Sequence, residues 1–284
     1  MGKKSDLGKH DKSVLKAMGM KKNIKIILNI ILNRFGFQTI PMYELKYINE
    51  KHQEAVNEYV CYLRETIFKD IKEDLQRNKL LTKLYGTTVG EAMYIIDCLN
   101  KTSDITGEVC EFGVANGSTS VLIANEIKST NKKLWLYDSF QGLSKPTKED
   151  VLINDIFNLG AMVNYESTMS YPDSYVRSKL TSINFPKRRT RIITGFIDKT
   201  IYLSLPKKVA FAYIDFDLYE PTMITLDRLD RVLSKGSFVV VDDYDYFSSG
   251  VKIAVDKFVK KHRKYKLIMP KKFAGKFCIL HKFK

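Results

Sequence analysis

The chain has 284 residues, which is enough for one large domain or for a core domain with an extension. Hydrophobic residues make up 44% of it, as is ordinary for a soluble globular protein, while 47 Lys and Arg against 32 Asp and Glu give a net charge of +15. No apolar stretch reaches the roughly 18 to 20 residues that a membrane-spanning helix needs, so the sequence excludes such a helix.

The positive charge is concentrated at the two ends of the chain. Residues 1–40 hold nine basic and two acidic residues, a net of +7, and residues 251–284 hold twelve basic residues and one acid, a net of +11. The total of +15 therefore leaves residues 41–250 with a net charge of −3. Basic segments favour nucleic acid or anionic membrane as partners, and here that inference applies to the ends alone. A solvated Lys-rich surface is an equally weighted alternative.

The first part of the chain is predicted to be a basic extension, which we place at residues 1–84. Residues 1–19 are polar and Lys-rich, so we expect them to be disordered. Residues 43–85 contain few helix breakers and carry mixed charge, which predicts helix. The extension is therefore expected to be disordered at first and then helical.

Within the extension, residues 21–37 form an amphipathic stretch. Lys25, Asn29 and Asn33 fall at i, i+4 and i+8 and make one polar stripe, with isoleucines and a leucine on the other side. Basic flanks and such a face suit peripheral contact with an anionic membrane surface. The alternative, which we weight more heavily, is that this helix packs on the core or on a second subunit.

From residue 85 onward, strand and helix patterns alternate. The predicted strands are residues 108–114, 133–140, 191–195, 209–217 and 237–243, followed by two short strands at 265–270 and 277–283 that could pair at the sheet edge. Several of these runs are apolar on both faces, which is typical of parallel strands covered by helices on both sides. The prediction is an α/β domain over residues 85–284 with a doubly wound, mostly parallel sheet of the Rossmann-like type.

Helices are predicted between these strands. One begins at Ser118 or Thr119, either of which could serve as its N-cap, and another ends at Gly236 as its C-cap. Residues 250–262 place apolar side chains at helical spacing. Residues 143–189 fit the alternation poorly, since they are polar and hold three prolines, so we expect a lid or insertion there.

The four cysteines are Cys61, Cys98, Cys110 and Cys278. None forms a CxxC pair, and their spacing matches no zinc pattern. Cys110 and Cys278 lie inside apolar runs and are expected to be small buried hydrophobic residues. This usage suits a reducing compartment, and we predict a cytoplasmic protein.

Acidic residues gather where predicted strands end. Asp138 ends the second strand, Asp215 and Asp217 end the fourth, and Asp242 and Asp243 end the fifth. In a doubly wound sheet ligands bind beyond the C-terminal ends of the strands, so one crevice could collect these acids. Adjacent carboxylates repel by roughly 1 to 4 kcal/mol at ~4 Å, and something must offset that repulsion.

The sequence EFGVANGST, from Glu111 to Thr119, indicates a strand, a glycine-rich turn and a helix start. It is not GxGxxG, and it lacks the P-loop lysine. The glycines allow close approach of the backbone to a ligand, and Asp138 at the end of the next strand could accept both hydroxyls of a ribose. These features favour a nucleoside-bearing cofactor, S-adenosylmethionine rather than NAD. A turn or cap role is the alternative for Asp138.

The remaining acids predict a hard-cation site formed by Asp215, Asp242 and Asp243. Magnesium takes oxygen ligands and would neutralise crowded carboxylates. The alternative is that Asp242 and Asp243 cap the following helix or pair with the basic C-terminal region.

From about residue 80 to its C-terminus, the chain resembles the macrocin O-methyltransferase type of protein, magnesium- and S-adenosylmethionine-dependent sugar O-methyltransferases with the class I methyltransferase fold. The resemblance is carried by EFGVANGST, YDSFQGL, ITGFIDKT, IDFDLYEPT and VVVDDY, in the family's order and close to its spacing.

The resemblance implies roles for individual residues. The cofactor would contact the following residues: Glu111, Gly113, Asn116, Gly117 and Ser118 around its methionine part, Asp138, Ser139 and Phe140 around its ribose, and Gly195 and Phe196 near its adenine. Asp215, Asp242 and Asp243 would bind Mg2+, with Asp215 also acting as the catalytic base. The resemblance also implies a homo-oligomer, a dimer or larger.

Two positions depart from the family's pattern. Phe216 stands where the family has glycine between the two acids, and Pro221-Thr222 replaces its Ser-Thr. The metal-binding acids are unaffected by either change, whereas the fit of the acceptor near Phe216 and Pro221 is put in question.

The predicted activity is methyl transfer from S-adenosylmethionine to a hydroxyl of a sugar, nucleotide sugar or glycan. A magnesium ion near that hydroxyl would lower its pKa, and Asp215 would accept its proton. The alternatives are a catechol-type O-methyltransferase, a nucleic-acid methyltransferase suggested by the basic ends, and a non-catalytic scaffold. The net charge of −3 in residues 41–250 argues against nucleic acid as a partner.

Overall fold

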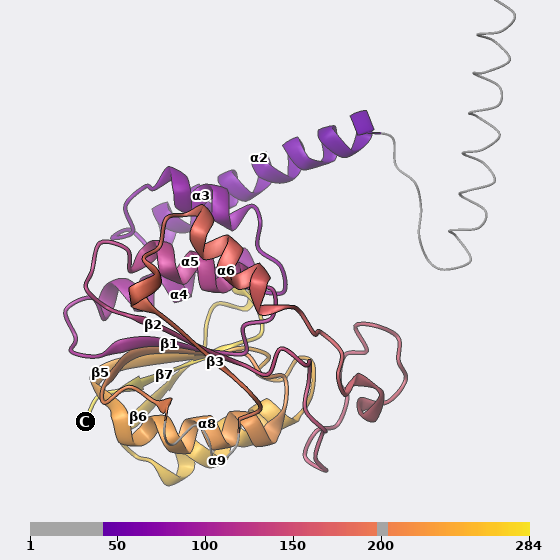
Figure 1. Ribbon diagram of the computed structural model, residues 1–284, viewed down its shortest axis with the longest axis vertical. Coiled ribbons are helices and arrows are strands. Elements are labelled where there is room, and N and C mark those ends of the chain that lie inside the picture. Colours follow the sequence, from indigo (N-terminus) through magenta and orange to yellow (C-terminus); the bar gives the residue numbers. More distant parts are fainter. Residues whose placement is uncertain (1–41, 198–203) are drawn as a thin grey trace, which may run out of the picture. The chain divides into compact units, whose positions relative to one another are not determined.

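The computed structural model describes residues 42–197 and 204–284 (Figure 1). The chain divides into two compact units, residues 1–55 and 56–284. Of the first unit, the structure describes the beginning of helix α2 (Met42–Thr66). The predictions for residues 1–19 and 21–37 lie outside the described residues.

The second unit is built around a seven-stranded sheet with the strand order β3-β2-β1-β4-β5-β7-β6. The strands are β1 (Glu108–Phe112), β2 (Leu134–Asp138), β3 (Thr190–Thr194), β4 (Val209–Ile214), β5 (Leu233–Val241), β6 (Tyr265–Ile268) and β7 (Cys278–Lys282). The first five are parallel, and β7 pairs antiparallel with both β5 and β6. The predicted doubly wound, mostly parallel sheet is confirmed.

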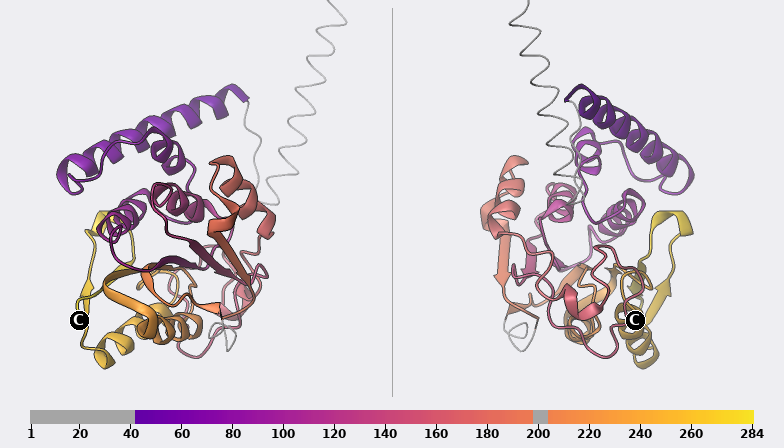
Figure 2. Two further views of the ribbon diagram at one scale, coloured as in Figure 1. Left: turned by 60° about the vertical axis from the view of Figure 1, so that its left-hand side comes forward. Right: turned by 90° about the vertical axis from the view of Figure 1, so that its right-hand side faces the viewer.

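Helices cover both faces of this sheet, as Figures 1 and 2 show. They are α3 (Leu75–Leu81), α4 (Val89–Lys101), α5 (Ser118–Glu126), α6 (Asp173–Ser182), α8 (Tyr219–Val232) and α9 (Gly250–Lys261), with short 3-10 helices at Met162–Tyr165, Lys187–Arg189 and Lys272–Ala274. Helices α4, α5 and α6 contribute to one buried cluster, and α8 and α9 to another.

The central strand β4 explains why the sheet is buried on both faces. All six of its residues are buried, with Phe211 and Tyr213 in the cluster under α4 and α5, and Ala212 and Ile214 in the cluster under α8 and α9. Because successive side chains alternate between faces, a continuous apolar run serves both layers. The acids predicted to form the site follow β4 and β5, so they lie where strongly buried strands end.

Residues 56–84 pack in the second unit. Val56, Val60 and Leu63 of α2 share a buried cluster with Met93 of α4 and Leu122 of α5. The boundary that the sequence places after residue 84 thus falls within this unit. Among the described residues, no helix has both the length and the apolar character needed to cross a membrane.

Two local predictions are wrong. The helix expected to end at Gly236 ends at Val232, and β5 begins at Leu233. Gly236 has a φ of +87° and lies where the pairing of β5 with β4 shifts register, so it permits a bulge instead of capping a helix. Neither Ser118 nor Thr119 is an N-cap, since Gly117 occupies that position in the left-handed conformation.

Candidate active site

A cavity of about 660 Å³ lies at the C-terminal ends of the parallel strands. Its volume is in the range typical of small-molecule sites. It is lined by the turns after β1, β2, β3, β4 and β5 and by the irregular stretch of residues 143–171, called here the wall segment. The acids at the strand ends, Asp138, Asp215, Asp217, Asp242 and Asp243, all line it, so the predicted crevice exists.

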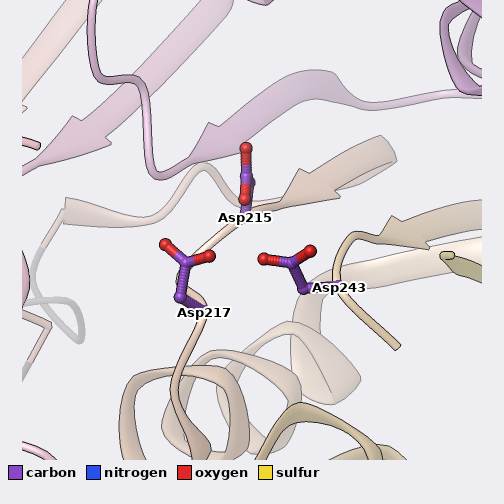
Figure 3. A group of neighbouring side chains, drawn as sticks. All are labelled: Asp215, Asp217 and Asp243. Carbon is purple, nitrogen blue, oxygen red and sulfur yellow. The ribbon is translucent and has the colours of Figure 1, made fainter. Parts of the chain in front are cut away.

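Three of these acids converge on one point. Asp215 and Asp217 follow β4 and Asp243 follows β5, and one carboxylate oxygen of each lies within 4.8 Å of the others (Figure 3). Asp217 and Asp243 have φ values of +63° and +55°, a left-handed conformation that aspartate adopts more readily than most residues. These backbone turns aim side chains from two strands at a common centre.

The environment of the cluster opposes negative charge. The pKa of Asp215 and that of Asp243 lie well above the usual range, because both carboxyls are removed from bulk water and repel their acidic neighbours. Burial also raises the pKa of Asp217. Three converging oxygen donors whose ionised forms are destabilised fit a hard divalent cation, which would offset the repulsion. The donor set therefore suits magnesium.

Asp242 lies beside this group and has other partners. Its Oδ1 accepts a hydrogen bond from the backbone N–H of Asp243 at 2.7 Å, and its Oδ2 accepts one from the hydroxyl of Tyr213 at 3.1 Å. Burial raises the pKa of Asp242 to about 6. Asp242 lines the cavity, so its predicted place among the metal ligands stays a prediction.

Two acids near the centre were not in the predicted metal or catalytic set. For Asp217 the sequence does hold an indication, because this acid follows Asp215 by two residues at the end of an apolar strand. Glu91 of α4 is fully buried against Asp242 and Tyr213, and burial together with the charges of Asp242 and Asp215 raises its pKa well above the usual range. Nothing local in the sequence of α4 indicates that contact.

Asp138 joins two of the turns around the cavity. Its Oδ2 accepts hydrogen bonds from the backbone N–H groups of Val114 and Ala115 at 2.7 and 2.9 Å, and its Oδ1 accepts one from Phe140 at 2.6 Å. The turn role considered for Asp138 is therefore real. Since each carboxylate oxygen can accept two hydrogen bonds, Oδ1 still has capacity for a ligand hydroxyl in the cavity.

The first glycine of the turn after β1 is required by close packing of the backbone. Gly113 has a φ of +82°, and a Cβ there would overlap the carbonyl oxygen of Asp215. Gly113 thus lets the ends of β1 and β4 approach each other at the floor of the cavity. The same residue lines the cavity and leaves it open to a ligand.

The predicted cofactor residues divide into two sets. The cavity is lined by Gly113, Asp138, Ser139, Gly195 and Phe196, whereas Glu111, Asn116, Gly117, Ser118 and Phe140 are not among its lining residues.

The second set has partners elsewhere. Asn116 Oδ1 accepts hydrogen bonds from Lys179 Nζ at 2.7 Å and from the backbone N–H of Ser118 at 3.0 Å. Gly117 packs against Val176 of α6. Glu111 is buried within β1, and neither of its carboxylate oxygens has a hydrogen-bond partner of normal geometry among the described residues.

The wall segment is joined to the loop after β5. Leu152 forms an antiparallel bridge with Ser248, and the backbone N–H of Ile153 donates to the carbonyl of Phe247 at 2.9 Å. Ser249 donates its N–H to the carbonyl of Val151 at 3.0 Å. This part of the stretch expected as a lid or insertion is thus hydrogen-bonded to the loop that follows Asp242 and Asp243.

Asp150 holds the wall segment to the start of α8. Its side chain is buried, and its Oδ1 accepts the backbone N–H of Tyr219 at 2.7 Å, while its Oδ2 accepts the N–H and hydroxyl of Thr147 at 2.7 and 2.9 Å. Leu218, the N-cap residue of α8, has no side-chain cap of its own. Asp150 therefore caps α8 from a distant part of the chain.

Comparison with known proteins extends this picture. The family model described as macrocin O-methyltransferase (TylF) matches residues 88–270. One curated relative is the 8-demethyl-8-(2,3-dimethoxy-alpha-L-rhamnosyl)-tetracenomycin-C 4'-O-methyltransferase of Streptomyces olivaceus, which is 25% identical over 49% of this chain and 54% of its own length. Another is the mycinamicin III 3''-O-methyltransferase of Micromonospora griseorubida, which is 27% identical over 49% of this chain and 56% of its own length. The chain spans little more than half the length of these relatives.

Solved structures support the fold. The O-methyltransferase NovP is 22% identical, with a TM-score of 0.60 over 69% of this chain and 81% of its own. The calicheamicin methyltransferase CalS11 is 19% identical, with a TM-score of 0.57 over 87% and 95%.

Proposed function

This chain belongs to the macrocin O-methyltransferase family, as its motifs predicted, and we propose that it transfers a methyl group from S-adenosylmethionine to a hydroxyl of a sugar or glycan, with magnesium at the acid cluster. One observation carries the proposal. A single cavity places the glycine turn bound by Asp138 next to three converging carboxylates, at the strand ends where ligands bind in this fold.

On the cofactor side, Gly113 leaves space for the methionine part, and Asp138 with Ser139 would hold the ribose. Gly195 and Phe196 follow β3 and line the same cavity, which suits the adenine, since an aromatic ring can stack on it. Asn116, Gly117, Ser118 and the buried Glu111 support this turn from behind rather than lining the cavity.

On the metal side, Asp215 and Asp243 would hold magnesium, with Asp217 or Asp242 as a further ligand. Magnesium bound there would stabilise the ionised form of a nearby acceptor hydroxyl and lower its pKa. Asp215 is one of the converging acids and is our candidate for the base that takes the hydroxyl proton.

The chemical step is a displacement at the methyl carbon. The acceptor oxygen forms a bond to that carbon, the carbon–sulfur bond of the sulfonium breaks, and its electron pair stays on sulfur. The proton of the hydroxyl passes to the carboxylate of Asp215. The protein contributes by holding oxygen, carbon and sulfur in line, which removes much of the entropic cost of the reaction.

The aromatic part of the cavity lining suits a sugar acceptor. Phe157 of the wall segment, Phe216 and Tyr246 line it with aromatic surface, against which the C–H faces of a sugar ring can pack. The names of two curated relatives specify O-methylation of a rhamnosyl-tetracenomycin and of mycinamicin III. Phe216 and Pro221, which depart from the family's pattern, both line the cavity and would shape acceptor choice.

The remaining expectations stay proposals. The six acidic residues of the cavity wall, Asp138, Asp215, Asp217, Glu220, Asp242 and Asp243, disfavour a nucleic-acid strand there because its phosphates would be repelled. An aromatic catechol-type acceptor would also suit the aromatic wall. Homo-oligomer formation, peripheral membrane contact through residues 21–37 and a cytoplasmic location are proposed on the sequence alone.

The test combines cofactor binding with methyl transfer. We expect calorimetry to detect S-adenosylmethionine binding, and transfer to one or more of a panel of glycosides, glycans, nucleotide sugars and catechols to stop with EDTA and return with magnesium. Asp215→Asn should abolish turnover and leave cofactor affinity within about two-fold. Asp245→Asn is the control, since Asp245 is an exposed acid in the loop after β5 and pairs with Lys252 outside the cluster. Near-normal turnover in Asp215→Asn would remove Asp215 from the mechanism, and failure to bind the cofactor would leave a non-catalytic scaffold as the better explanation.

A further inference from the structure

A buried tyrosine hydroxyl lies directly behind two acids of the proposed metal site. Tyr213 is on β4, two residues before Asp215, and its side chain is completely buried. Its hydroxyl oxygen is 3.1 Å from Oδ2 of Asp242 and 3.4 Å from Oδ2 of Asp215. One hydroxyl therefore contacts acids that follow two different strands, β4 and β5.

The tyrosine hydroxyl is itself held by a second polar contact. Thr87 Oγ1, just before α4, lies 3.5 Å from it, and Thr87 Oγ1 in turn lies 2.7 Å from Thr119 Oγ1 of α5. The three hydroxyls can donate in one direction, from Thr119 to Thr87 to Tyr213, which leaves the phenol proton for the acids. Such a chain fixes the hydroxyl in an interior where an unpaired polar group would be costly.

The two acids benefit from a donor between them. Asp242 and Asp215 repel each other, and a hydroxyl placed between their carboxylates offsets part of that repulsion. Asp242 Oδ1 accepts from the backbone N–H of Asp243, its Oδ2 accepts from Tyr213, and the buried carboxyl of Glu91 also lies against this side chain. Among these contacts the phenol hydroxyl is the one that lies close to both Oδ2 of Asp242 and Oδ2 of Asp215.

We propose that Tyr213 is a positioning residue for the metal site: its single hydroxyl proton, donated to Asp242 at 3.1 Å and shared with Asp215 at 3.4 Å, holds the two carboxylates in place for a divalent cation in the cavity. The proposal rests on the proposed function, since it assumes that the acid cluster binds such a cation. Groups behind the ligands of a metal site commonly change metal affinity by 10- to 100-fold when they are removed, roughly the range expected here.

The chain offers a matched control. Tyr137 of the neighbouring strand β2 is also buried, and its hydroxyl donates to the carbonyl of Ser204 at 3.1 Å, on the other face of the sheet from Tyr213. Tyr137→Phe and Tyr213→Phe each remove one buried hydroxyl from the sheet core. They differ in whether that hydroxyl contacts the acids.

The experiment measures Mn2+ binding by the full chain, with free Mn2+ followed by electron paramagnetic resonance, and S-adenosylmethionine binding by calorimetry. We expect Tyr213→Phe to weaken Mn2+ binding by about 10-fold or more, with cofactor affinity unchanged within about two-fold. Tyr137→Phe should change Mn2+ affinity less than about two-fold. A general loss of structure would weaken both ligands, so the split between them identifies positioning.

Two results would overturn the proposal. Mn2+ affinity in Tyr213→Phe within two-fold of wild type would show that the hydroxyl does not orient the acids. Absence of Mn2+ binding in the wild-type protein would overturn the metal site itself, and with it this inference. If Tyr213→Phe does not fold, Thr87→Val replaces it, because Thr87 contacts Tyr213 and neither acid. We then expect affinity to fall about three-fold, and unchanged affinity would again contradict the proposal.

Discussion

Glu111 lies buried in the sheet, and replacing it with glutamine should change how stability depends on pH. Its side chain lies within β1, and neither carboxylate oxygen has a partner of normal geometry among the described residues. Burial raises its pKa from 4.5 to about 8, although the nearby hydroxyl of Ser120 offsets part of this effect. Glu111 is therefore protonated in the folded protein at a pH where the unfolded chain has already ionised.

The sign of the effect follows from proton binding. Between pH 4.5 and about 8, the folded state holds a proton at Glu111 that the unfolded state has lost. Stability therefore falls as pH rises through this window. At about 1.4 kcal/mol per pKa unit, the full difference is roughly 5 kcal/mol, of which about 2 to 3 kcal/mol is lost between pH 5 and pH 7.

Glu111→Gln removes this term because glutamine does not ionise. We expect the stability of the variant relative to wild type to rise by about 2 to 3 kcal/mol between pH 5 and pH 7. The assay is urea unfolding of the metal-free and cofactor-free protein at several pH values, with the midpoint and slope compared at each. The value at pH 5 serves as the internal reference, since any loss of packing caused by the amide is present at both pH values.

Asp242 is present in both proteins and its contribution cancels in this comparison. The pKa of Asp215 is raised in part by Glu111, so the variant also loses that smaller contribution, which acts in the same direction. Parallel pH dependences for wild type and Glu111→Gln would refute the reasoning, because they would mean that Glu111 is ionised or solvated in the folded protein. A flatter curve in the variant would support it.

Two further predictions concern the cavity. Mn2+ affinity of the wild-type protein, titrated at several pH values, should rise between pH 6 and pH 8. The reason is that the pKa values of Asp215 and Asp243 are raised, so protons compete with the cation for these carboxylates. Affinity that falls as pH rises would contradict this. Asp150→Ala should destabilise the fold by about 1 to 3 kcal/mol in urea unfolding, because it leaves the backbone N–H groups of Tyr219 and Thr147 without their acceptor. The same variant should raise the KM of the acceptor more than the Kd of the cofactor. Equal changes in the two constants would argue against a role for the wall segment in acceptor binding.

The basic C-terminal region is partly explained by ion pairs on the surface. Lys261 lies 3.4 Å from Asp227, and Lys264 lies 2.9 Å from Asp230, so two acids of α8 offset part of the positive charge of residues 251–284. Exposed pairs of this kind contribute little stability. They favour the interpretation of this end as solvated surface over a dedicated nucleic-acid site.

The architecture could be predicted because its signals are local. The apolar run of β4 and the alternation of strands with helices are written in neighbouring residues, and they predicted a parallel sheet buried on both faces. The same runs mark where strands end, so the sequence also located Asp138, Asp215 and Asp243 at one edge of the sheet. Gly113 was found because a glycine turn after a strand is a contiguous pattern.

The choice among adjacent acids was beyond the reach of local pattern. Asp217 and Asp243 turn toward the common centre because their backbones adopt positive φ, and Asp242 is directed to Tyr213. Whether an acid next to a strand end faces the cavity depends on the backbone conformation after that end. The partner it meets comes from another strand, and no spacing rule gives either.

The sequence by itself determined the fold, the family motifs and the edge of the sheet that carries the site, because hydrophobic periodicity and strand ends are encoded in consecutive residues. Only the tertiary structure decided which acids converge, which residues support them and how the cavity is closed. Glu91 comes from α4 to meet Asp242, and Asp150 comes from the wall segment to cap α8. Such contacts join residues far apart in the chain, and packing and buried charge, rather than sequence spacing, bring them together.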